Sequence, residues 1–159
     1  MIALIQGAAD TLSGEKAVDV RAYAGELADE RLTDVKRLVE RRPTILVGFA
    51  ARRSASPSTN ERYREEIIVL SIYLCTRSMR SREDAHRGAY GLIEIVDHAI
   101  YGADADVASA VDQDGLRVEG EIQMSDPVVE VSREEVCVLS LSLEIPLRRD
   151  VDALLGIEA

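Results

Sequence analysis

Residues 63–75 have the sequence YREEIIVLSIYLC, an apolar run in which successive side chains fall into two alternating sets. In an extended strand, Leu70 and Ile72 would lie on one face, and Val69 and Tyr73 on the other. The run predicts a long central strand, around which the remaining elements are arranged.

The preceding segment predicts the partner of this strand. Residues 44–51 read TILVGFAA, a short continuous apolar run of the kind found in strands that are covered on both faces. Between the two runs, Arg52 to Arg62 is polar and contains Pro57, which predicts a loop. A hairpin with such a long loop often uses the surplus length to contact partners.

Helical spacing of apolar residues predicts three helices. Residues 1–12 form a short amphipathic pattern that ends at Ser13-Gly14, and a short strand at 18–22 follows. Residues 32–42 predict a second helix, stopped by Pro43. The strongest pattern starts at a capping Ser81 and continues to Gly102.

Further strands are expected in the C-terminal part, at 116–122, 128–131 and 136–146. This order groups the strands too closely for a regular parallel β-α-β chain. We expect an α+β fold, a mostly antiparallel sheet with the two main helices, 32–42 and 81–102, packed on one face. The chain 1–159 should form a single domain, with a tail at 150–159 that is either a docking helix or a loose end.

The charge of the chain is unevenly distributed. Residues 1–100 carry 15 basic and 15 acidic side chains, whereas residues 101–159 carry 4 and 14, so the C-terminal third supplies the whole net charge of −10. This balance argues against binding nucleic acid through a wide basic surface. With 4% aromatic residues and no Trp, there is also little material for base stacking.

Cys75 and Cys137 each lie in an apolar segment, where a cysteine usually acts as a small buried hydrophobe. Two cysteines cannot complete a four-ligand zinc site, so we expect no metal. Because each cysteine is expected to be a buried hydrophobe, we also expect no functional disulfide. No apolar run approaches the roughly 20 residues that cross a bilayer, and the start lacks the features of a secretory signal. We therefore expect synthesis in the cytoplasm and no membrane partner.

Sequence motifs of enzymes are missing from the chain. Neither a P-loop nor a dinucleotide-binding glycine pattern occurs, and no G-x-S-x-G elbow is present. The two histidines, His86 and His98, lie on one predicted helix beside Asp84 and Asp97. Twelve helical residues separate them by about 18 Å, too far to share a metal. We expect no catalytic residues and no cofactor, with a small hydrolase using either histidine as the remaining alternative.

Arginines gather around the two ends of the predicted hairpin, whereas the chain has only two lysines. Arginine is enriched at protein contacts and lysine is depleted, so these side chains are candidates for an interface. A basic patch on one copy would face an acidic patch on the next, and such head-to-tail contacts can close into a ring. The alternative is a solvated surface paired with nearby acids. The candidates are Arg52, Arg53, Arg62, Arg64, Arg77, Arg80 and Arg82.

Several blocks of the sequence resemble a known family. The blocks are VRAYAGEL at 20–27, a helix ending in Arg42-Pro43, ILVGFA at 45–50, RSMRS at 77–81 before a helix, and a closing strand that ends in IPL at 145–147. Over roughly residues 18–148 they resemble the Mu-like phage tail proteins that include tail terminators.

The resemblance implies a structural subunit of a hexameric ring that caps the finished tail tube. Its expected partners are further copies of itself, the tube and sheath proteins and a neck or head-completion protein, while DNA only passes through. The expected location is the virion tail, and the host cytoplasm during assembly. A head-tail adaptor or neck ring is the alternative within the same structural class.

Overall fold

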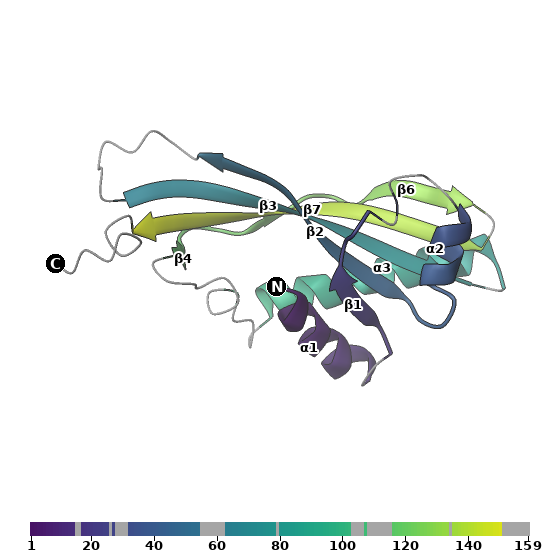
Figure 1. Cartoon of the computed structure of the whole chain (residues 1–159). Helices are drawn as coiled ribbons and strands as arrows, with labels where there is room; N and C mark the ends of the chain where they lie inside the picture. Colours follow the sequence, from purple (N-terminus) through teal and green to yellow (C-terminus); the bar gives the residue numbers. More distant parts are fainter. Residues whose placement is uncertain are drawn as a thin grey trace.

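One mixed, mostly antiparallel sheet organises the described part of the chain (Figure 1). The computed structural model describes residues 1–14, 17–25, 27, 32–54, 63–78, 80–102, 107, 116–133 and 135–150. The helices are α1 (Ile2–Ser13), α2 (Leu32–Leu38) and α3 (Arg82–Tyr101). The strands are β1 (Asp19–Ala22), β2 (Thr44–Ser54), β3 (Tyr63–Arg77), β4 (Leu116–Val118), β5 (Gln123–Met124), β6 (Val128–Arg133) and β7 (Val136–Asp150).

The predicted long strand is the centre of this sheet. β3 pairs antiparallel with β2 on one side and with β7 on the other, and the pairing with β7 runs without interruption from Tyr63 opposite Asp150 to Arg77 opposite Val136. Among the described strands only β1 runs parallel to its neighbour, since the chain crosses back through α2 before it enters β2. The prediction of a central strand is confirmed.

The outer edge of β7 is lined by three short strands in succession. β6, β5 and β4 all pair antiparallel with β7, from its first residues to its last. At Gly120 the chain between them takes a φ of +117°, and a Cβ there would lie 3.1 Å from Pro146 Cγ. A side chain at residue 120 would therefore be strained and crowded, which accounts for the glycine where the edge strands are interrupted.

Apolar side chains cover both faces of the sheet, as the alternation in β3 requires. On one face Ile72 and Leu74 pack with α1 and α3 in the larger core cluster. On the other face Cys75 and Leu46 pack with Val35 of α2 in a smaller cluster. Helices α1 and α3 therefore cover one face of the sheet, and α2 covers the other.

This arrangement confirms an α+β fold with a mostly antiparallel sheet and helices packed against it. The placement of the helices differs from the expectation, because the segments predicted as 32–42 and 81–102 lie on opposite faces. The N-terminal helix α1, and not α2, shares a face with α3. Helical periodicity shows that a helix has an apolar side, but it does not show which face of the sheet that side covers.

The local signals at α3 are present in the structure. Ser81 is the N-cap, and its hydroxyl oxygen accepts a hydrogen bond from the Asp84 backbone N–H at 3.1 Å. At the other end the Gly102 N–H donates to the His98 carbonyl at 2.9 Å. The predicted boundaries at Ser81 and Gly102 are confirmed.

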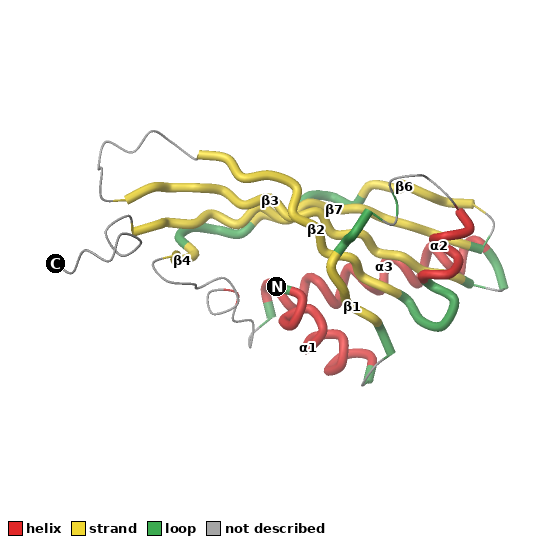
Figure 2. The backbone as a smooth tube through the Cα atoms, in the orientation of Figure 1, coloured by secondary structure: helices red, strands yellow, loops and turns green. Residues whose placement is uncertain are grey.

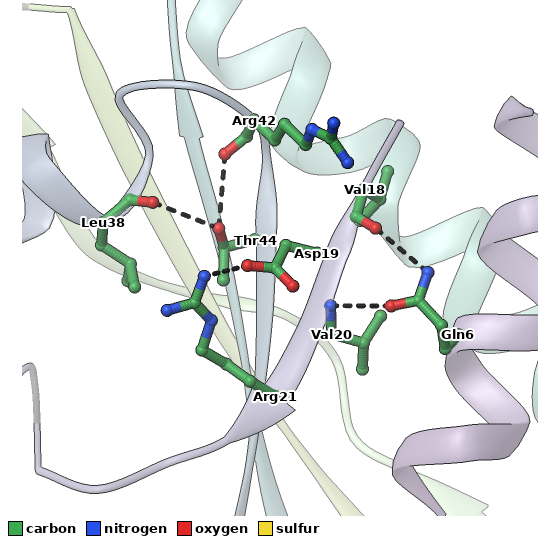
Figure 3. A network of polar contacts seen from close by, with 8 residues as sticks. All are labelled: Gln6, Val18, Asp19, Val20, Arg21, Leu38, Arg42 and Thr44. Carbon is green, nitrogen blue, oxygen red and sulfur yellow. Dashed lines mark hydrogen bonds and ion pairs between the residues drawn. The ribbon is translucent and has the colours of Figure 1, made fainter. Parts of the chain in front are cut away.

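A side-chain bridge fixes α1 against β1 (Figure 3). The Gln6 amide nitrogen donates to the Val18 carbonyl, and its amide oxygen accepts from the Val20 N–H, both at 3.1 Å. One side chain thereby satisfies two backbone groups of the segment that forms the sheet edge. Behind this edge, the Thr44 hydroxyl lies between the Leu38 and Arg42 carbonyls at the start of β2.

The sheet continues well past the helices as a twisted extension (Figure 2). We call this extension the ribbon; it comprises residues 49–54 of β2, 63–70 of β3 and 143–150 of β7. Arg52 and Arg53 belong to β2, so the prediction that the loop begins at Arg52 is wrong. Residues 55–62, the acidic segment 103–115 apart from Val107, and the tail beyond Asp150 lie outside the described residues.

Both cysteines are buried thiols and form no disulfide. Desolvation raises the pKa of Cys137, and the positive charge of Arg82 opposes this effect. None of the described helices is both long and apolar enough to cross a membrane.

Candidate interface surfaces

The candidate arginines of the ribbon are held across strands by carboxylates. Arg52 forms an ion pair with Glu66 of β3, and Arg53 forms one with Glu144 of β7. Arg64 is exposed on β3, and Arg62 lies outside the described residues. The bonds connect strands that are far apart in sequence, so these side chains are oriented by the sheet.

Glu66 is the buried member of this group, with 7% of its side chain exposed. One carboxylate oxygen faces Arg52, and the other lies 3.7 Å from the Arg149 guanidinium without a close hydrogen bond. The hydrogen bond from Arg52 to Glu66 raises the pKa of Arg52 above its usual value, opposed by desolvation. Two positive charges flank one buried negative charge, which leaves the cluster with a positive surplus.

The remaining candidate arginines lie at the helix-covered end of β3. Arg77 donates to Glu135 at 2.8 Å, and the Arg82 Nε–H donates to the Ser132 hydroxyl at 2.9 Å. Arg80 is exposed in the turn before α3. Arg64 and Arg77 are separated by 13 strand residues, or roughly 43 Å. The six predicted residues that the structure describes therefore belong to two surfaces at opposite ends of the sheet.

The free edge of β2 exposes the only phenylalanine of the chain. β1 pairs with β2 at Thr44 to Val47, and among the described residues no strand pairs with the outer side of Phe49–Arg53. Phe49 is 67% exposed, contrary to the prediction that this run is covered on both faces. We call Phe49–Arg53 the β2 edge.

The outward face of α3 borders a groove of about 850 Å³. Its floor includes Tyr90, Gly91 and Ile93, its C-terminal end includes Glu94 and Asp97, and its N-terminal end includes Arg82 and Arg87. The spacing of Tyr90, Ile93, Glu94 and Asp97 places them on one stripe of the helix, beside the buried face. We call this feature the α3 groove.

The C-terminal end of the groove is strongly acidic. The Tyr101 hydroxyl donates to the Ile122 carbonyl at 2.9 Å. Desolvation raises the pKa of this tyrosine, and the negative charges of Asp97 and Glu121 add to the effect. A positively charged partner would be favoured at this end, since it would offset these negative charges.

The edge of the sheet beside α3 also exposes apolar side chains. Val128 and Val129 of β6 are 58% and 47% exposed. β6 is joined to α3 through Ser132, whose hydroxyl contacts both Arg82 and His86. The start of the α3 groove therefore lies close to β6, at the margin of the sheet opposite the β2 edge, while α3 itself packs over β3 and β7.

The two histidines have different environments. His86 Nε2 lies 2.9 Å from the Ser132 hydroxyl oxygen, whereas His98 is exposed on the far part of α3. Among the described residues, no carboxylate forms a hydrogen bond with His86, and no group of three His, Cys, Asp or Glu side chains is placed to hold a metal.

Sequence reasoning found the arginines but missed Phe49 and the α3 groove. Two signals in the sequence point to the groove: Tyr90 and Gly91 interrupt the polar face of an otherwise regular amphipathic helix. Phe49 carried no such signal, because its exposure depends on β1 ending opposite Val47.

Comparison with protein-family models and with curated protein sequences finds no match for this chain.

Proposed function

We propose that the protein is a structural subunit of a ring that terminates the tail tube of a phage or a phage-tail-like particle and provides a docking surface for the head or neck. The proposed class is a non-enzymatic, tail-terminator-like assembly protein, and the sequence resemblance supports this proposal. The structure adds support for one part of this proposal, the assembly of copies into a ring.

The observation that carries the proposal is the presence of two different exposed surfaces, one at the free edge of β2 and one on the outward side of α3 with the neighbouring β6. One is the β2 edge with Phe49, and the other is the α3 groove with Val128 and Val129 of β6. A subunit of a cyclic ring meets two neighbours, and it needs a different surface for each of them. Exposed apolar side chains on an otherwise well-covered domain mark such surfaces.

The two ends of the sheet offer further support. Charged side chains gather around Arg52 and Glu66 at the ribbon and around Arg77 and Glu135 at the other end. A terminator must contact the tube on one side and the neck on the other. Charged surfaces roughly 36 Å apart, the length of the 11 strand residues from Glu66 to Arg77, would serve these two contacts separately.

The test of this function is tail length. A subunit that stops a polymer must bind the tube end more favourably than another tube ring does, yet offer no surface that accepts the next ring. Electron microscopy of lysates lacking the gene should show overlong or irregular tails without heads. Tails of normal length that fail to join heads would instead identify a head-tail adaptor or neck ring.

A hydrolase is the second candidate, favoured by the Ser132–His86 contact. A serine hydroxyl within hydrogen-bond distance of an imidazole has the geometry of a nucleophile and its base. The same contact also fastens α3 to β6, which is its role in the ring proposal. His86→Ala and His98→Ala genes should restore normal particles; failure of a well-folded His86→Ala subunit would favour the hydrolase.

A further inference from the structure

Resting on the proposed ring, we infer that neighbouring copies join by seating the β2 edge of one copy in the α3 groove of the next. Phe49 would pack on Tyr90, Gly91 and Ile93. The guanidinium groups of Arg52 and Arg53 would face Glu94 and Asp97.

Phe49 has the properties of an anchor residue. It is an aromatic side chain held on a paired strand, so its position is fixed by the β2–β3 ladder opposite Leu70. Its side chain continues the row of Val47 and Ile45, which are buried two and four residues earlier. Interfaces are commonly dominated by a few such rigid apolar side chains that enter a pocket on the partner.

The α3 groove offers a matching apolar floor. Tyr90 is 50% exposed, and a Cβ built on Gly91 would meet nothing within 4 Å. The glycine leaves open space beside Tyr90, between Arg87 and Glu94, where an aromatic ring from another copy could lie against the tyrosine. Packing of two aromatic rings adds to the burial of apolar area.

The charges beside these apolar surfaces are complementary. Arg52 and Arg53 follow Phe49 at the β2 edge and point to opposite faces of the sheet, toward Glu66 and Glu144, and about half of each side chain remains exposed despite its ion pair. Glu94 and Asp97 follow Tyr90 and Ile93 on α3, at the acidic end of the groove. A second copy would bring the basic side chains of its β2 edge to the acidic end of the groove. This complementarity makes another copy of the chain the expected occupant of the groove.

The positions of the two surfaces favour a ring. Each copy carries the β2 edge at one margin of the sheet and the α3 groove on the helix layer that covers β3 and β7, next to β6 at the opposite margin. A contact between two different surfaces leaves one of each unused in a pair, so further copies add until the circle closes. An isologous dimer would need the same surface on both partners.

A groove-filling substitution tests this inference on the full chain. Gly91→Trp fills the α3 groove, and Gly7→Trp makes the same change at an exposed position of α1 that also has nothing within 4 Å of a Cβ. Both replace a helical glycine, which is itself unfavourable in a helix, so both subunits should keep their fold. Association is measured by analytical ultracentrifugation, and folding by thermal melting.

We expect Gly91→Trp and Phe49→Ala to weaken ring association by at least about tenfold, while Gly7→Trp stays within about twofold of the unchanged protein. Equal association of the two tryptophan variants would overturn the inference. Rings that form normally with Gly91→Trp but no longer bind purified tube protein would assign the groove to the tube instead of to a second copy.

A charge exchange provides the second arm. Arg53→Glu alone and the pair Glu94→Arg with Asp97→Arg should each reduce association, and combining all three should restore it in part. Independent losses without recovery would count against a direct contact. If rings form in all variants while the gene deletion gives overlong tails, this inference fails and the proposed function stands. If the protein is a monomer at every concentration and the deletion gives tails of normal length, both the inference and the proposed function fail.

Discussion

The helix-covered half of the sheet and the ribbon are built from the same three strands but have opposite surroundings. In the covered half, Leu74 of β3 and Leu139 of β7 are fully buried in the core cluster that includes α3. In the ribbon, the same strands bury Leu143, Ile145 and Leu147 but also carry Arg52, Arg53 and Glu66 in cross-strand ion pairs. Both halves contain apolar packing, while only the ribbon combines it with charged side chains held in fixed positions.

This difference indicates that the two parts of the same continuous strands have different roles. The unbroken ladder between β3 and β7 transmits the rigidity of the covered half into the ribbon. Charged side chains on a rigid strand lose less conformational entropy on binding than the same side chains on a loop. The ribbon therefore suits a contact surface, provided that the covered half supplies the stability.

The largest expected effect tests whether the covered half supplies most of the stability. Leu74→Ala removes a fully buried side chain from the core beneath α3 and should lower the free energy of unfolding by about 2–5 kcal/mol. Phe49→Ala, at the exposed β2 edge, should change it by less than about 0.5 kcal/mol. Denaturant unfolding followed by circular dichroism measures both variants at a concentration where the chain is monomeric. Similar losses for the two would remove the contrast between the halves.

The helix cap gives a smaller effect within the covered half. Ser81→Ala removes the acceptor for the Asp84 N–H and should cost about 1 kcal/mol, whereas Ser81→Asp keeps an acceptor and should cost little. Because Ser81 belongs to neither the β2 edge nor the α3 groove, ring association should be unchanged in both variants. A loss of association with Ser81→Ala at full helicity would extend the interface to the start of α3.

Local signals predicted the covered half well. Alternation in residues 63–75 and 136–146 identified β3 and most of β7, and Ser81 with Gly102 bounded α3. These patterns work because a buried face imposes a strict period on the side chains that fill it. The sharing of helices between the two faces was not predictable, since Val35 of α2 would fit either face.

The ribbon was harder to predict, for a physical reason. Arg52 and Arg53 continue β2, yet their strand faces carry charge and give no apolar period, so the segment resembled a loop. Their order comes from Glu66 and Glu144, which lie 14 and 91 positions away in the sequence. The exposure of Phe49 likewise depends on the end of β1, a tertiary feature.

The smallest effect separates the two arginines of the β2 edge. Arg52 partners the buried Glu66, whereas Arg53 partners the more exposed Glu144. Arg52→Ala leaves Glu66 with only the more distant Arg149, so it should lower the free energy of unfolding by about 1 kcal/mol, reduced by the solvent around Arg52. Arg53→Ala should cost less than about 0.5 kcal/mol. Denaturant unfolding of both variants in a Glu66→Gln background completes a double-mutant cycle, in which only the cost of Arg52→Ala should shrink. Equal costs in the native background would show that burial of Glu66 does not distinguish the two pairs, and would make Arg52 as free as Arg53 to serve the contact between copies.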